Sequence, residues 1–90
     1  MATSSGTDVG IDVSKDRLDI AVLGEKQAWQ VDNSGEGIPQ LVKRMLELDP
    51  ERIVIEATGG YQRAVVDALF HAGLSVAVVN PARVRQFACL

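Results

Sequence analysis

The stretch DVGIDVSKDRLDIAVL at residues 8–23 decides the fold. In residues 8–13 every second residue is branched and apolar, and this period of two predicts a strand. Residues 14–16 are polar and predict a turn, after which residues 18–23 read as a second strand. The turn is short enough for the two strands to pair as an antiparallel hairpin. One acid, Asp12, lies inside the otherwise apolar first strand.

Three further strands are predicted beyond this hairpin. Residues 28–32 follow a polar turn and contain Trp29 and Val31 in alternation. Residues 52–55 are strongly β-branched, as is typical of buried parallel strands, and residues 74–79 form a similar run. Glu56 stands directly after the first of these runs.

Two helices separate the later strands. Apolar residues recur at helical spacing through residues 38–48, after the helix-capping types Asn33 and Ser34, and Asp49-Pro50 ends this helix. A second apolar helical face runs through residues 61–72, after the turn Thr58-Gly-Gly, with Gly73 as the expected C′ residue.

The order is three strands, a helix, a strand, a helix and a strand, which predicts an α/β protein with right-handed crossovers. This order matches the ribonuclease-H-like mixed sheet of five strands, in which the first strand is central and the fourth lies parallel beside it. The chain has 90 residues, enough for one domain. We expect residues 1–7 to be a disordered leader, residues 8–90 to form the domain, and residues 82–90 to open another helix.

The composition limits the function. A net charge of −3 argues against a stand-alone nucleic-acid binder, because such binding depends on clustered Lys and Arg. It does not exclude a metal-dependent nuclease, where a divalent cation supplies positive charge to an acidic pocket. A single cysteine, no signal-peptide pattern and no apolar run long enough to span a bilayer predict a cytoplasmic protein.

Asp12 and Glu56 are the candidate metal ligands. A carboxylate inside or at the end of an apolar strand is costly unless it is paired or binds a metal. If the first and fourth strands are neighbours, both carboxylates converge near one edge of the sheet, where hard oxygen ligands suit Mg²⁺ or Mn²⁺. The alternative is structural: Asp12 begins the polar turn, and Glu56 simply ends a strand.

Four blocks of sequence resemble a known family. They are VGIDVSK at residues 9–15, LDIAV at residues 18–22, IVIEATGGY at residues 53–61 and VNPARVRQFA at residues 79–88. In this order and spacing they resemble the opening of the DEDD-type transposases of bacterial insertion sequences. The catalytic domain of that family resembles the Holliday-junction resolvase RuvC.

The resemblance implies that Asp12 and Glu56 are the first two of four catalytic, metal-binding acids. The third and fourth acids of the family lie on a helix beyond the last matching block, and a later domain carries a nucleophilic serine. We therefore expect the carboxyl-terminal part of the domain to be missing from this chain, which would be inactive alone. For the full-length protein the resemblance implies cutting and rejoining of DNA during transposition, with a structured non-coding RNA as a further partner.

Four cations are weaker candidates for contacts with nucleic acid. Lys15 and Arg17 lie in the hairpin turn near Asp12 and could touch a phosphate, although a solvated turn explains them as well. Arg83 and Arg85 could contact nucleic acid, or could form a polar helix face.

Two other functions stay open. A nucleotide-binding module of the actin-like ATPase and sugar-kinase class also opens with a Gly-Ile-Asp strand, but its turn usually has small residues, where this chain has Ser14-Lys15-Asp16. The other is a non-catalytic remnant that self-associates through apolar helix faces left uncovered, which would make it a homo-oligomer. Binding of ATP at the turn would favour the first of these, and self-association without metal binding the second.

Overall fold

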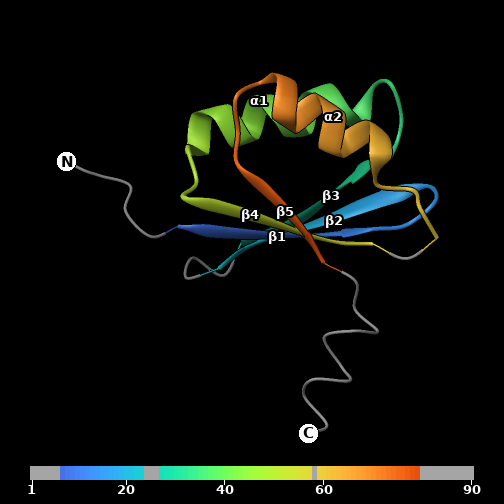
Figure 1. Ribbon diagram of the computed structural model, residues 1–90, viewed down its shortest axis with the longest axis horizontal. Coiled ribbons are helices and arrows are strands. Elements are labelled where there is room, and N and C mark those ends of the chain that lie inside the picture. The colour runs from blue at the N-terminus through green and yellow to red at the C-terminus, as the bar shows by residue number, and fades with distance from the viewer. Residues whose placement is uncertain (1–6, 24–26, 58, 80–90) are drawn as a thin grey trace, which may run out of the picture.

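The computed structural model describes residues 7–23, 27–57 and 59–79. In this part of the chain five strands form one sheet, and two helices lie across one of its faces (Figure 1). The elements in chain order are β1 (Asp8–Val13), β2 (Arg17–Leu23), β3 (Gln27–Asp32), α1 (Gly37–Leu48), β4 (Arg52–Ala57), α2 (Arg63–His71) and β5 (Val76–Val79).

The sheet is mixed, with strand order β3-β2-β1-β4-β5. The strands β1, β2 and β3 pair antiparallel, whereas β4 lies parallel to both β1 and β5. The predicted α/β fold, with the first strand central and the fourth parallel beside it, is therefore confirmed. Residues 1–6 of the expected leader and the helix expected over residues 82–90 lie outside the described residues.

Apolar side chains from β1, β2 and β4 pack under the two helices. Alternation directs every second residue of these strands toward the helices, so the helix-facing side of the sheet becomes the core. The buried core residues are Val9, Ile11, Val13, Leu18, Ile20, Val22, Ile38, Leu41, Met45, Ile53, Ile55, Val65 and Leu69. On the side of β3, the guanidinium of Arg44 on α1 lies 4.3 Å from the ring centroid of Trp29.

The start of α1 and the ends of both helices are as expected, whereas α2 begins at Arg63, so Tyr61 lies before the helix and not on its face. The hydroxyl of Ser34 accepts hydrogen bonds from the backbone N–H groups of Glu36 and Gly37, at 3.3 and 3.2 Å. Asp49, directly before Pro50, has a φ of 51° and ends α1. At the end of α2, Gly73 has a φ of 85°, and the N–H of Leu74 bonds to the carbonyl of Leu69 at 3.1 Å. This pattern is the Schellman motif, and it confirms Gly73 as the C′ residue.

Some boundaries differ from the prediction. The strand β4 continues to Ala57, so Glu56 lies inside the strand and not after it. The reason is that the parallel pairing with β1 extends through Val13, so that neighbouring backbone groups keep partners beyond the apolar run. Likewise β5 begins at Val76 because Leu74 is used by the cap of α2.

The second face of the sheet is not covered by any described helix (Figure 1). It forms an open hollow of about 820 Å³. Neither α1 nor α2, the helices of the described ranges, is long and apolar enough to cross a membrane. The uncovered face is where the candidate acids lie.

Candidate metal centre on the open face of the sheet

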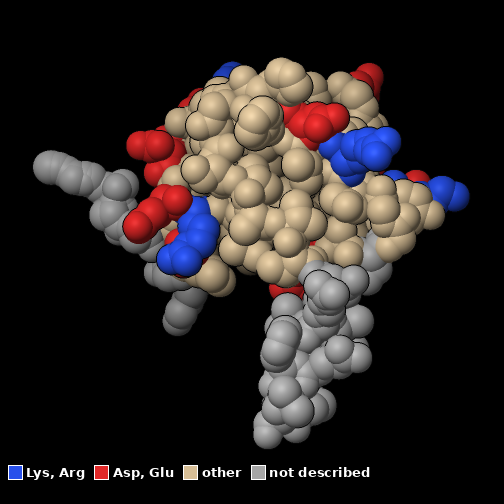
Figure 2. All heavy atoms as spheres, in the orientation of Figure 1, with Lys and Arg blue, Asp and Glu red and all other residues tan. Residues whose placement is uncertain are grey.

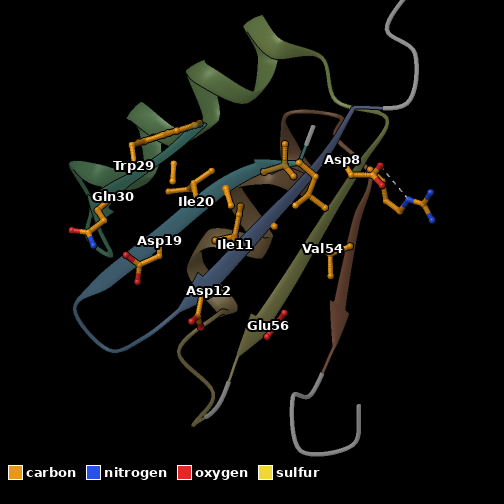
Figure 3. A pocket seen from close by; sticks show the side chains of 15 residues that line it. Asp8, Ile11, Asp12, Asp19, Ile20, Trp29, Gln30, Val54 and Glu56 are labelled. Atoms are coloured by element: carbon orange, nitrogen blue, oxygen red, sulfur yellow. Dashed lines mark ion pairs between the residues drawn. The ribbon is translucent and has the colours of Figure 1, made fainter. Parts of the chain in front are cut away.

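The strand register brings three carboxylates into one row. Asp12 on the central strand is the direct partner of Glu56 on β4 and of Asp19 on β2. All three line the open hollow, and Figure 3 shows them on one side of the sheet. The predicted convergence of Asp12 and Glu56 is therefore present in the structure.

Alternation explains why these acids face outward. The neighbours of Asp12 in β1, Ile11 and Val13, are buried under the helices, and so is Ile55 beside Glu56. Asp12 and Glu56 are exposed, and Asp19 is half-buried. Adjacent strands lie about 4.8 Å apart, so Asp12 and Glu56 start close enough for one cation to bridge their carboxylates.

The row is a concentration of negative charge. Like charges directly opposite each other on neighbouring strands destabilise a sheet. The ion pair found among the described residues joins Arg52 and Asp8, at 3.5 Å between Nε and Oδ1, near the other end of the same face. Among the described residues no ion pair joins a cationic side chain to Asp12, Asp19 or Glu56, and hard carboxylate oxygens are suited to a divalent cation.

The acids provide two ligands and not a complete site. Within residues 7–23, 27–57 and 59–79, no three His, Cys, Asp or Glu residues are grouped closely enough to hold a metal ion. The carboxylate oxygens of Asp12 and Glu56 therefore fit two of the ligands of a Mg²⁺ or Mn²⁺ ion, and its other ligands would have to come from water, from substrate or from residues outside this pair.

The centre of the open face is small and apolar. Between the acid row and the Arg52–Asp8 pair, neighbouring strands contribute Ala28, Ala21, Gly10, Val54 and Ala77. A Cβ atom built at Gly10 would meet no atom within 4 Å. Because these side chains are small, the surface of the sheet beside the acids has no large protruding group.

Lys15 lies in the β1–β2 turn, three residues beyond Asp12, and Arg17 is the first residue of β2; both are exposed. They line a smaller hollow together with Ser14, Asp16 and Asp32. Arg17 donates a hydrogen bond to Oε1 of Gln30 at 3.4 Å. Two acids share this hollow, so its positive charge is partly offset.

The described cations do not form one patch in the view of Figure 2, where Lys and Arg lie apart and beside Asp and Glu. Arg83 and Arg85, the other predicted nucleic-acid contacts, lie outside the described residues. The face shown in Figure 2 therefore has no cluster of basic side chains of the kind on which nucleic-acid affinity rests.

Sequence reasoning missed two residues here. Asp19 lies beside Asp12, and the alternation of β2 with the length of the hairpin turn could have placed it there. Asn33 was considered only as a helix-capping type, yet its side-chain amide bonds to two separate turns. No local pattern signals such a contact, because the partner turns are 19 and 28 residues away in sequence.

Comparison with known proteins identifies the family. Residues 9–90 match the family described as Transposase, of the DEDD type named for the insertion sequence IS110. The chain belongs to the DEDD transposases. This match confirms the resemblance predicted from the four sequence blocks, and it does not favour the nucleotide-binding alternative. Among curated proteins, none is similar enough in sequence to count as a match to this transposase chain.

The fold of the transposase chain resembles that of RuvC from Thermus thermophilus, with a TM-score of 0.59 at 24% sequence identity. The similarity covers 89% of this chain and 65% of RuvC, so the transposase chain spans less than two thirds of that protein. A protein from Pseudomonas aeruginosa with similarity to the peptidase YEAZ is more distant, with a TM-score of 0.49, 16% identity, and coverage of 84% and 44%. The RuvC similarity establishes the ribonuclease-H-like fold.

Proposed function

We propose that this chain contributes to a metal-dependent transposase that cuts and rejoins DNA strands, and that Asp12 and Glu56 hold its Mg²⁺ or Mn²⁺. The pairing of Asp12 with Glu56 across the parallel strands β1 and β4 supports this proposal most directly. Family membership supports the reaction class.

The two acids would act by binding and orienting the cation. When bound, such a cation lowers the pKa of a water molecule and stabilises the charge on a leaving oxygen in phosphodiester cleavage. The carboxylates of Asp12 and Glu56 would hold it on the open face, where a DNA strand has access. Lys15 and Arg17, at the adjoining turn, would contact DNA phosphates.

A further part of the proposal is that these 90 residues do not cut DNA alone. The resemblance implies a four-acid site, whereas the described residues contribute no group of three ligands. The partners proposed for the complete protein are DNA and a structured non-coding RNA. A cytoplasmic location and homo-oligomerisation remain predictions.

Metal binding can be tested with Mn²⁺, whose unpaired electrons broaden nearby NMR signals. In the ¹⁵N-labelled chain we expect selective broadening of amides close to Asp12 and Glu56, with Mg²⁺ competing for the same site. Asp12→Asn or Glu56→Gln should weaken the effect at least about tenfold, because each removes one of two carboxylate ligands. Glu47→Gln, which neutralises an exposed acid on α1, is the matched control.

Broadening that is equal at all exposed acids, or that is unchanged in both site variants, would contradict the metal assignment. Inactivity is tested separately with supercoiled plasmid DNA and Mn²⁺. We expect no nicking by the chain alone. Nicking that disappears in Asp12→Asn would show that the 90 residues are active by themselves.

A further inference from the structure

A single side-chain amide, that of Asn33 directly after β3, joins the turns that follow β1 and β4. Nδ2 of Asn33 donates to the carbonyl of Ser14 at 2.9 Å and to the carbonyl of Tyr61 at 3.2 Å. The backbone N–H of Asn33 also donates to the carbonyl of Asp16, at 3.0 Å. Only the –NH₂ group of the amide can donate, so two carbonyl acceptors define its orientation.

These turns leave the strands that hold the acid pair. Ser14 follows Val13 directly, and Tyr61 lies on the connection from β4 to α2. Val13 and Ala57 form the last register pair between β1 and β4, and Asp12 and Glu56 form the pair before it. Asn33 therefore joins the two segments that leave β1 and β4, just beyond the strand ends where both carboxylates lie.

The side chain adds a link that the backbone cannot replace. The bond from the N–H of Asn33 to Asp16 already attaches residue 33 to the β1–β2 turn, and it persists in most substitutions. By contrast, the connection to Tyr61 depends on the amide group alone. This turn contains Gly59 and Gly60 at positive φ, and the residue Tyr61 is 46% exposed, so packing restrains the turn weakly.

We propose that Asn33 is a positioning residue for the Asp12–Glu56 pair. By joining the turns after β1 and β4, it limits opening of the terminal strand pairs and so limits the spread of distances between the two carboxylates. The consequence for metal binding rests on the proposed function, whereas the effect on strand opening does not. Terminal pairs without such a link open more often than the core.

Hydrogen exchange of the metal-free chain tests whether Asn33 limits opening of the strand ends. In Asn33→Ala, protected amides of residues 12–13 and 56–57 should exchange roughly three- to tenfold faster relative to those of residues 9–11, the range allowed by loss of a hydrogen bond. Asn33→Asp should behave similarly, because its carboxylate keeps the shape but cannot donate. Asn33→Gln keeps the donor and should restore part of the protection.

Ser34→Ala is the matched control. It removes the acceptor for two N–H groups at the start of α1 next to Asn33, and it leaves the amide of Asn33 in place. We expect it to lower the stability of the chain without a selective effect on residues 12–13 and 56–57. A selective effect as large as that of Asn33→Ala would overturn the assignment to the Asn33 amide.

Mn²⁺ titration tests whether Asn33 also affects metal binding by Asp12 and Glu56. In Asn33→Ala the affinity for Mn²⁺, measured per folded chain, should fall roughly two- to tenfold, and in Ser34→Ala it should not change. Failure of the unaltered chain to bind Mn²⁺ at Asp12 and Glu56 would overturn the proposed function, yet faster exchange in Asn33→Ala would still show the link. Normal exchange and normal affinity in Asn33→Ala would overturn the positioning role.

Discussion

At the scale of single residues, Asp12 has an unusual environment for a central strand. Its direct partners on both sides, Asp19 and Glu56, are also acids. The folded chain therefore brings together charges that the unfolded chain keeps apart, and exposure to water reduces the resulting repulsion without abolishing it. This cost is what a bound divalent cation would reverse.

Asp12→Asn should consequently stabilise the metal-free chain. Removing the middle charge relieves two repulsions, and we expect the free energy of unfolding in urea to rise by up to about 1 kcal/mol at low ionic strength. The gain should shrink at high salt, because exposed charges are screened. Asp67→Asn, on α2, is the control. Equal stability of Asp12→Asn and the unaltered chain at low salt would count against repulsion in the row.

Gly37 is required for a close approach. A Cβ atom at this position would collide with the carbonyl oxygen of Asp32, which belongs to the backbone and cannot move aside easily. Gly37→Ala should lower the free energy of unfolding by about 1–3 kcal/mol through overpacking. Gly10→Ala, at a glycine with open space, should be neutral or slightly stabilising in the same urea titration. Similar losses in both variants would contradict the steric explanation.

At the scale of elements, the two helices contribute to the fold through one face each. Leu41 and Met45 of α1 and Val65 and Leu69 of α2 are completely buried against the sheet. Leu46 and Phe70, on the same helices, are 53% and 72% exposed. The apolar spacing that predicted each helix therefore also identifies its packed face, because burial of that face supplies most of a short helix's stability.

Leu41→Ala should therefore cost far more than Leu46→Ala. The first leaves a cavity under α1 and should lower the free energy of unfolding by about 2–5 kcal/mol. The second removes an exposed side chain, and we expect a change within about 0.5 kcal/mol. Thermal unfolding followed by circular dichroism separates the two. Equal losses would show that α1 packs through a different face.

At the scale of the whole molecule, the sheet has one face covered by helices and one face open in the described structure (Figure 1). Uncovered apolar surface lies on this open face and also on the helices, at Leu46 and Phe70. The centre of the open face consists of Ala, Gly and Val, with acids along one side. Homo-oligomerisation remains a prediction, and this hollow is the surface at which it can be tested.

Ala21→Glu tests that association. Ala21 lies on the open face, where a carboxylate would oppose apolar contact, so the variant should remain monomeric at concentrations at which the unaltered chain associates. Ala64→Glu, on an exposed position of α2, should associate normally. Sedimentation velocity over a concentration series measures both. A monomeric unaltered chain at all concentrations, or equal effects of the two variants, would remove the open face as the interface.

The identity and order of the elements follow from local patterns. Alternation between residues 8 and 23, helical spacing in residues 38–48 and the Gly73 cap each reflect interactions within a few residues, and each is present as predicted. The existence of an acid inside β1 was equally visible. Glu56 was predicted beside it only on the condition that the first and fourth strands are neighbours, because the register of β1 with β4 depends on packing between distant segments.

Nonlocal packing accounts for what local patterns missed. The Asn33–Tyr61 contact, between residues 28 apart, leaves no periodic trace in the sequence. The Asp12–Glu56 pair, 44 residues apart, could be predicted only by assuming that their strands are neighbours. The strand β4 extends past its apolar run because its backbone groups find partners on β1. The sequence by itself thus determined that Asp12 is a carboxylate inside an apolar strand. Its place beside Asp19 and Glu56 was decided by the tertiary structure, because burial of the opposite face of the sheet sets the pairing of the strands.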